Sequence, residues 1–183
     1  MKQKEIFLRS EGDAWFTRNQ QSVATRKFPD DDALLREIID FLPANTRKLK
    51  VLEVGCGEGT RLAWLKDNLH ADYYGIEPSA QAVAAACAKG INVQQGTADV
   101  LPFDNQNFDI MIFGFCLYLC DREDLFRIAS EADRVLHAPG WMMIIYFYRA
   151  RYRGPELITT ARACRATRWT IEPCLPGIRT TSA

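Results

Sequence analysis

The chain has 183 residues, of which 48% are hydrophobic and 25% charged, and 23 basic groups balance 23 acidic ones to a formal net charge of zero. This length suits one domain with its own core, and the composition excludes a disordered, collagen-like or disulfide-stapled chain. The longest apolar run, 110–120, is too short to span a membrane, and no apolar signal core follows the N-terminus. We therefore expect a cytoplasmic protein without a membrane partner.

The distribution of charge is uneven along the chain. Residues 149–183 contain seven Arg, no Lys and two acids, a net charge of +5, which leaves −5 for residues 1–148. The main body therefore has no basic stripe of the kind that binds nucleic acid, and no nucleic-acid partner is expected. The six cysteines and two histidines have no paired ligand spacing, which predicts reduced, buried thiols and no metal site.

Helical and extended patterns alternate along the main body. After a polar N-terminal stretch, a helix with one apolar face is expected from Asp30 to Leu42. We further expect strands at 49–54, 72–77, 91–95, 108–113 and 141–148, and helices at 60–70, 80–89 and 122–136, the last with Asp121 as its N-cap. This alternation predicts an α/β fold with a doubly wound parallel sheet. Ligands then bind beyond the carboxyl ends of the strands.

A glycine-rich turn follows the first expected strand. Residues 53–59 read Glu-Val-Gly-Cys-Gly-Glu-Gly, an acid followed by three alternating glycines. Glycines allow a sharp turn and a close approach of the backbone to a ligand, and the next helix directs free N–H groups at the same place. Three glycines between an expected strand and an expected helix indicate a ligand-binding loop.

Two further acids follow the next strands. Glu77 ends the second strand, where a carboxylate can accept both hydroxyl hydrogens of a ribose. The alternative for Glu77 is an acid facing the dipole of the following helix. Asp99 follows the third strand, where it can accept a hydrogen bond from the exocyclic amine of adenine; the alternative is a turn aspartate beside Gly and Pro.

With these motifs, the chain from Leu49 to Tyr148 resembles the class I S-adenosylmethionine-dependent methyltransferases, especially their small type 11 branch. The likeness extends to 104–109 and to 131–140, which reads Glu-Ala-Asp-Arg-Val-Leu-His-Ala-Pro-Gly. It implies a Rossmann-like sheet with strand order 3-2-1-4-5, S-adenosylmethionine as the cofactor, and methyl transfer to a small-molecule acceptor.

The resemblance also implies roles for the matching residues. The methionine part would lie among Glu53, Gly55, Cys56, Gly57 and Gly59, and the ribose beside Glu77, Pro78 and Ser79. Adenine would contact Asp99 and Val100, while Gly114, Phe115 and Cys116 would pass close to the sulfonium and the acceptor. In the N-terminal segment, Trp15 and Phe16 could form a lid and Arg18 could pair with the methionine carboxylate. Simple helix packing is the alternative for Trp15 and Phe16.

A sulfonium methyl group is already activated, so this reaction needs alignment of the reactants more than acid–base groups. An oxygen or nitrogen acceptor can still require a base. Tyr118 and Asp121, after the fourth strand, are the candidates at the correct edge. His70 ends a helix and His137 lies at the opposite end of the sheet, so both are interpreted as structural.

The C-terminal part departs from the family. We expect a domain at 1–148, with a helical cap at about 1–45, and an atypical Arg-rich tail at 149–183. The family continues with a helix and an antiparallel strand pair, whereas here a helix with a poor apolar face could form at 155–169 and the closing strands are expected to be missing or altered. The tail is either a lineage-specific extension or a frameshifted or truncated end, and we favour the second. The fifth strand would then expose an edge through which two copies could pair as a homodimer.

Two other functions stay open. A module that binds the cofactor but is catalytically impaired would fit the unusual tail and the absence of a convincing base. A nicotinamide-dependent oxidoreductase fits less well, because the three glycines form GxGxG rather than the dinucleotide fingerprint GxGxxG, and residue 60 is Thr.

Overall fold

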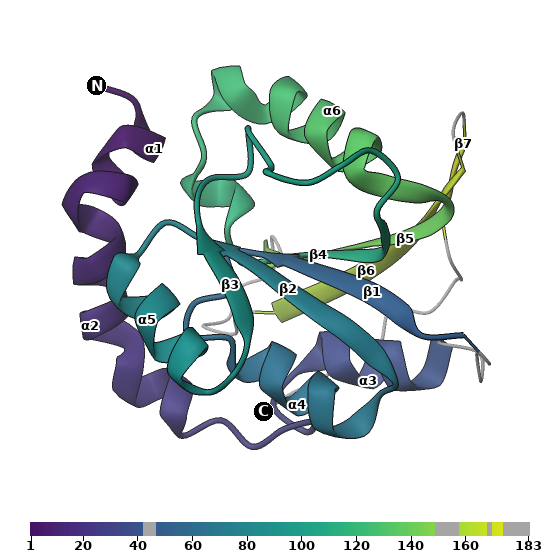
Figure 1. Cartoon of the computed structure of the whole chain (residues 1–183), viewed down its shortest axis with the longest axis horizontal. Coiled ribbons are helices and arrows are strands. Elements are labelled where there is room, and N and C mark those ends of the chain that lie inside the picture. The colour runs from purple at the N-terminus through teal and green to yellow at the C-terminus, as the bar shows by residue number, and fades with distance from the viewer. Residues whose placement is uncertain (42–46, 149–157, 168–169, 174–183) are drawn as a thin grey trace.

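The computed structural model describes residues 1–41, 47–148, 158–167 and 170–173, which form a seven-stranded sheet with helices around it (Figure 1). The strands lie in the order β3-β2-β1-β4-β5-β6-β7. Their bounds are Leu49–Val54 (β1), Ala71–Glu77 (β2), Asn92–Gln95 (β3), Phe108–Gly114 (β4), Leu136–Tyr148 (β5), Ile158–Thr167 (β6) and Thr170–Pro173 (β7). The first five strands are parallel, which confirms the predicted order 3-2-1-4-5.

Alternate residues of the central strands supply a separate core on each face of the sheet, as the two-residue period of a strand requires. On one face, Val51 and Ile110 belong to a cluster with residues of α3 (Ala33–Phe41), α4 (Thr60–Asn68) and α5 (Ala80–Ala88). On the other face, Leu52 and Met111 pack with α6 (Leu125–Val135). Figure 1 shows α6 on one side of the sheet and α3 and α4 on the other. The predicted helices and strands of 49–135 are therefore confirmed to within a few residues.

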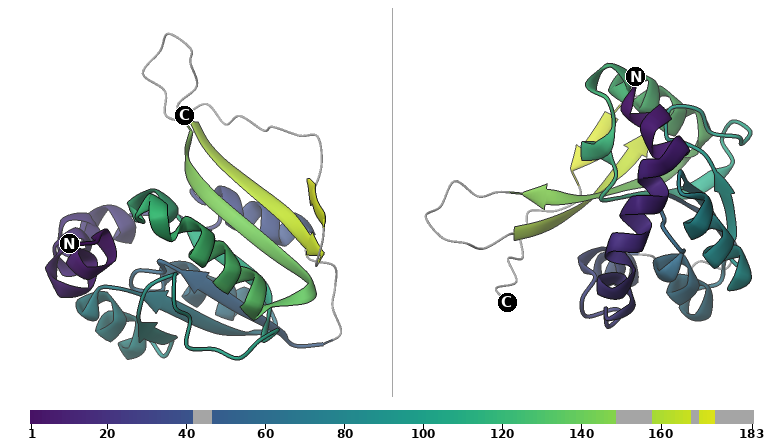
Figure 2. Two further views of the ribbon diagram at one scale, coloured as in Figure 1. Left: turned by 90° about the horizontal axis from the view of Figure 1, so that it is seen from above. Right: turned by 90° about the vertical axis from the view of Figure 1, so that its left-hand side faces the viewer.

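The N-terminal segment forms a helical rod of three parts, α1 (Gln3–Ile6), a π-helical stretch (Phe7–Glu11) and α2 (Gly12–Ala24). It stands across the end of the sheet and runs beside α5 (Figures 1 and 2). The contact is close, because a Cβ atom at Gly12 would lie 3.0 Å from the backbone nitrogen of Ser79. Asp13 accepts hydrogen bonds from Ser79 Oγ (2.6 Å) and Gln81 N (3.1 Å), so α2 helps to cap α5.

The segment around α6 differs in detail from the prediction. Residues Arg122–Asp124 form a 3₁₀ turn before α6, and Asp121 occupies the N-cap position of this turn, but its side chain makes no capping hydrogen bond. Its carboxylate instead accepts a hydrogen bond from Gln3 N (2.7 Å), because the N-terminal rod reaches this point. The next strand, β5, begins at Leu136 rather than at 141, and a register shift opposite Phe108 and Ile110 absorbs the extra residues.

The C-terminal part corrects two predictions. Residues Ile158–Thr167 form strand β6 instead of a helix, and β7 follows it, so antiparallel strands are present after β5. Threonines and a poor helical face favour the extended state beside an open strand. Because β6 pairs with β5 from Gly140 to Tyr148, the edge of β5 is covered and offers no surface for a homodimer. The rest of the Arg-rich tail and the predicted helix end at Leu42 lie outside the described residues. Over the described ranges, no helix is both long and apolar enough to cross a membrane.

Candidate functional site

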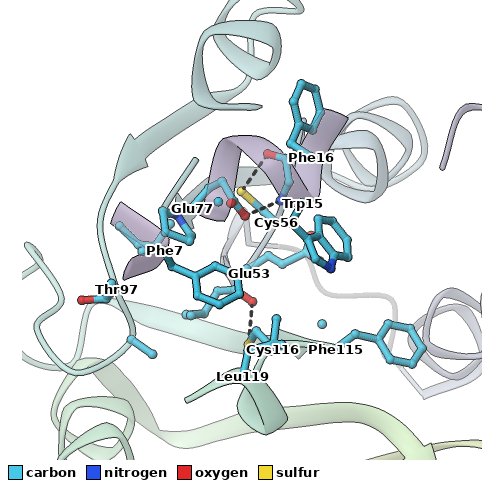
Figure 3. A pocket seen from close by; sticks show the side chains of 18 of the residues that line it. Phe7, Trp15, Phe16, Glu53, Cys56, Glu77, Thr97, Phe115, Cys116 and Leu119 are labelled. Atoms are coloured by element: carbon cyan, nitrogen blue, oxygen red, sulfur yellow. Dashed lines mark hydrogen bonds between the residues drawn. The ribbon is translucent and has the colours of Figure 1, made fainter. Parts of the chain in front are cut away.

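A cavity of about 410 Å³ lies at the carboxyl ends of β1, β2 and β4, with the N-terminal rod as its other wall (Figure 3). Figure 3 shows Thr97 toward one end of the cavity and Phe115 toward the other, with Glu53 and Glu77 between them. This is the edge where the sequence predicts a ligand site. The predicted residues that line it are Trp15, Phe16, Glu53, Gly55, Cys56, Gly57, Glu77, Pro78, Asp99, Gly114, Phe115, Cys116, Tyr118 and Asp121.

The glycine loop turns through left-handed backbone conformations that only glycine adopts without strain. The φ angles are 73° at Gly55, 55° at Gly57 and 69° at Gly59. A Cβ atom at Gly55 would lie 2.6 Å from Cys116 Cβ, so this position needs glycine for space as well. A Cβ atom at Gly57 would meet nothing within 4 Å, which leaves the backbone open to a ligand on the cavity side. The backbone of the loop at Gly57 is therefore accessible to a ligand in the cavity.

Glu53 lies at the centre of the site and is 1% exposed. One carboxylate oxygen, Oε1, pairs with the buried Arg61, whose guanidinium also binds Asp32 (Nη2–Oδ2 2.8 Å). The other oxygen, Oε2, is buried and has no hydrogen-bond partner among the described residues. Burial raises the pKa of Glu53 to about 7 in spite of Arg61. A buried acceptor without a donor, beside a cavity, fits a ligand that carries a cationic or N–H group.

Glu77 faces the same loop from the end of β2. Its carboxylate accepts hydrogen bonds from Gly57 N (2.9 Å) and Ser79 N (3.0 Å), and the side chain lines the cavity. Burial raises the pKa of Glu77, and these two N–H donors only partly offset that effect. The contacts fix the carboxylate in one orientation and leave lone pairs for the hydroxyl groups of a ribose.

Asp99 lies at the other end of the cavity and is 4% exposed. Its Oδ1 accepts a hydrogen bond from Thr97 Oγ1 (2.7 Å), and its Oδ2 pairs with Lys4 of the N-terminal rod. Burial by itself would raise the pKa of Asp99, but the hydrogen bonds from Lys4 and Thr97 outweigh it and hold the pKa below the usual value. Asp99 is therefore an ionised acceptor, as recognition of an amine requires.

The turn after β4 lies beside Glu53 and lines the end of the cavity opposite Thr97 (Figure 3). Phe115 has a φ of 55°, which is a strained conformation for a bulky side chain, and Phe115 N donates to Ile145 O (3.0 Å). A Cβ atom at Gly114 would lie 2.8 Å from Glu53 Oε1, so any side chain there would strike the Glu53–Arg61 pair. Burial raises the pKa values of Cys56 and Cys116 well above the usual range, which leaves both as neutral thiols rather than nucleophiles.

Four predicted residues do not line the cavity. Arg18 lies on the outer side of α2, with a side chain that is 58% exposed and pairs with Glu11 at 2.5 Å, so the structure does not support its pairing with a methionine carboxylate. Gly59 is buried against Ala86 and Ile91. Ser79 caps α5 by accepting from Ala82 N (3.0 Å), and Val100 is 55% exposed.

The sequence did not single out several residues that the cavity contains. Arg61 follows the glycine loop, and its place beside Glu53 could have been inferred from a helix that starts at Thr60. Lys4, Phe7 and Phe28 come from a polar segment without a local signal. Only the packing of the rod against the ends of the strands brings them to the site.

The two candidates for a catalytic base both line the cavity. Burial raises the pKa of Tyr118, so its phenol is protonated at neutral pH and is a weak base. Asp121 accepts from Gln3 N and holds the N-terminal rod. Within the described residues, no group of three or more His, Cys, Asp or Glu side chains could hold a metal ion.

Comparison with known proteins identifies the class of this site. Residues 51–140 match the family described as a methyltransferase domain, and this segment includes β1, β2, β3, β4 and the three acids of the cavity. Over these residues the chain is a methyltransferase domain.

Relatives of this methyltransferase include enzymes named for lipid substrates. A fatty-acid O-methyltransferase of Mycolicibacterium smegmatis is 32% identical over 118 residues, which cover 62% of this chain and 42% of the relative. A phthiotriol/phenolphthiotriol dimycocerosates methyltransferase of Mycobacterium tuberculosis is 38% identical over 69 residues, covering 34% of this chain and 25% of the relative. The chain thus spans less than half the length of these two curated relatives.

A solved structure supports the fold of the methyltransferase. Geranyl diphosphate C-methyltransferase from Streptomyces coelicolor A3(2), in complex with Mg²⁺, geranyl diphosphate and S-adenosyl-L-homocysteine, aligns with a TM-score of 0.57 and 19% identity. The alignment covers 69% of this chain and 49% of that chain. At this identity the likeness concerns the architecture of the sheet and helices.

Proposed function

We propose that this methyltransferase binds S-adenosylmethionine as its cofactor and transfers the sulfonium methyl group of that cofactor to a small-molecule acceptor. It acts mainly by holding cofactor and acceptor in line. The observation that carries the proposal is one continuous cavity that joins the acids at its centre to an aromatic wall. That wall contains Trp15, Phe28 and Phe115. An acceptor on this side would lie next to the turn after β4, where the backbone closes the cavity.

The buried acids assign places for the parts of the cofactor. The partnerless Glu53 Oε2 would accept from the methionine ammonium group, and the open backbone at Gly57 would follow the same part of the molecule. Glu77 would accept from the ribose hydroxyls and Asp99 from the adenine amine. The cofactor supplies a methyl group that is already activated by the positive sulfur.

The protein's own contribution is then orientation and the exclusion of water. Aromatic and apolar side chains around the transfer site keep water away, and the rigid turn at Phe115 fixes the angle of approach. Both cavity thiols are neutral, so a covalent cysteine intermediate has no support. The name of one relative, a fatty-acid O-methyltransferase, supports an apolar acceptor.

The test is calorimetric titration with S-adenosylmethionine and S-adenosylhomocysteine, followed by mass spectrometry of a panel of fatty acids, isoprenoids and phenols. We expect saturable binding that Glu77→Gln and Asp99→Asn each weaken by about tenfold or more. Arg18→Gln is the control, because Arg18 is exposed and lies outside the cavity. Binding without methylation of any acceptor would favour an impaired binding module, and tighter binding of NADH would favour the oxidoreductase.

A further inference from the structure

An ammonium group from the N-terminal rod lies at the adenine end of the cavity. Lys4 Nζ pairs with Asp99 Oδ2 and lies 3.1 Å from Asp124 Oδ2, and the Lys4 side chain is 27% exposed. Both aspartates are more than nine-tenths buried. One cation from α1 therefore joins an acid after β3 to an acid at the start of α6.

The surrounding contacts leave Asp99 with a defined orientation. Thr97 Oγ1 donates to Oδ1 and Lys4 to Oδ2, while Arg127 Nε donates to the backbone carbonyl of Asp99 (3.0 Å). Each carboxylate oxygen can accept about two hydrogen bonds, so one acceptor position stays available on each oxygen. Without Lys4, Asp124 would keep its partner Lys2, whereas the buried Asp99 would lose its cationic partner, and this loss would favour protonation or displacement of Asp99.

A second lysine on the same helix offers an internal comparison. Lys2 Nζ binds Asp124 Oδ1 at 2.8 Å and, like Gln3 N on Asp121, fastens α1 to the start of α6. Its ammonium group pairs with Asp124 and, unlike that of Lys4, does not line the cavity. Substitutions of Lys2 and of Lys4 can therefore distinguish the docking of α1 from the support of Asp99.

We propose that Lys4 is a positioning residue for adenine: by binding Asp99 and Asp124 together, it holds Asp99 as the oriented, ionised acceptor for the exocyclic amine. The inference rests on the proposed function, since it takes the adenine place of the cofactor to be at Asp99. Lys4 acts through Asp99 and takes no part in methyl transfer.

The test compares affinities for S-adenosylhomocysteine by calorimetry. We expect Lys4→Met to weaken binding by about tenfold, Lys4→Arg to retain most of the affinity, and the control Lys2→Met to bind like the wild type. In the Asp99→Asn background, Lys4→Met should have little further effect. An analogue of S-adenosylhomocysteine without the exocyclic amine should lose sensitivity to Lys4→Met, which a merely structural role would not produce.

The other outcomes separate the possible errors. Equal losses in Lys4→Met and Lys2→Met would mean that Lys4 only docks α1, and tighter binding in Lys4→Met would mean that Lys4 competes with adenine; either overturns the inference. If the wild type and Lys4→Met bind S-adenosylhomocysteine with equal affinity, the inference about Lys4 is overturned, whereas the proposed function is not. No wild-type binding would overturn both. Thermal unfolding of each variant confirms that it is folded, and Lys4→Arg gives a second reading where Lys4→Met is unstable.

Discussion

Gly57 and Gly90 have similar left-handed backbones in different surroundings. Their φ angles are 55° and 72°, and a Cβ atom would meet nothing within 4 Å at Gly57 and only Lys66 Nζ at 3.6 Å at Gly90. Gly57 lines the cavity, whereas Gly90 ends α5 on the exposed surface. The pair can therefore separate the conformational role of a glycine from its role in ligand binding.

We predict that Gly57→Ala and Gly90→Ala each reduce the free energy of unfolding by about 1–2 kcal/mol, because both force an L-residue into the left-handed region. Only Gly57→Ala should also weaken S-adenosylhomocysteine binding, by about tenfold, since the added methyl group would occupy space in the cavity beside the loop. Denaturant unfolding and calorimetry measure the two effects. Equal affinities of the two variants would contradict the inference that the ligand lies against the backbone at Gly57.

The raised pKa of Glu53 predicts a pH-dependent affinity. Burial places this pKa at about 7, and a cationic ligand beside Oε2 would lower it in the complex. Binding then favours the ionised carboxylate, so the affinity for S-adenosylhomocysteine should increase by up to about tenfold between about pH 6 and pH 8. Glu53→Gln is the control, because it retains the titration of the ligand's own amine. The same pH dependence in both proteins would exclude Glu53 as its source.

At the scale of elements, α6 is tied to the loop after β3 by a small polar network. Glu131 accepts from Leu101 N (2.7 Å), and Arg134 donates to the carbonyl oxygens of Leu101 (2.9 Å) and Phe103 (2.7 Å). Arg134 also pairs with Glu131 at 2.7 Å. The hydrogen bond from Arg134, followed by that from Leu101 N, lowers the pKa of Glu131 to about 2 although burial opposes the change.

We predict that Glu131→Gln loses stability at neutral pH and not in acid. A carboxyl group whose pKa falls on folding stabilises the protein above its unfolded pKa, here 4.5, and this contribution disappears as the pH falls through about 2. The variant should therefore be less stable by about 1–2 kcal/mol at neutral pH. Urea unfolding across the acid range measures the difference, and a gap that stays constant to the lowest pH would refute this origin.

The order of the elements was predictable because each carries a strong local signal. The segment 108–113 is almost wholly apolar, as a buried strand is, and 30–42 has the single apolar face of a helix. The rules for parallel connections then place the strands in one sheet. The C-terminal strands were missed because β6 has no strand pattern of its own and is extended through its pairing with β5. Long-range pairing, rather than local propensity, decides that segment.

The site was predictable in the same uneven way. The acids and glycines after the strands fall in fixed positions of the fold, so Glu53, Glu77 and Asp99 meet at one cavity. The wall formed by the N-terminal rod depends on which face of a weakly amphipathic helix turns inward. The sequence favoured Arg18 for this wall, whereas the structure turns Arg18 outward and brings in Lys4.

For the whole molecule, the cavity joins the N-terminal rod to the loops after β1, β2, β3 and β4, so a bound ligand should stabilise the entire fold. S-adenosylhomocysteine at one hundred times its Kd should add about 2.7 kcal/mol to the free energy of unfolding. At about 2–4 °C per kcal/mol for a chain of this size, the melting temperature should rise by about 5–10 °C. Differential scanning calorimetry measures the shift. A stable ligand complex without any shift would mean that the unfolded chain binds equally well.

The contacts of the rod also bear on how this protein can be shortened. The segment that matches the family begins at residue 51, so trimming to it would remove the N-terminal rod and the core helix α3. Yet Asp13 helps to cap α5, and Lys4 pairs with the buried Asp99 and Asp124. A version trimmed to the family boundaries would keep its catalytic signature while losing one wall of its binding cavity. The segment that matches the family is therefore shorter than the segment that forms the cavity.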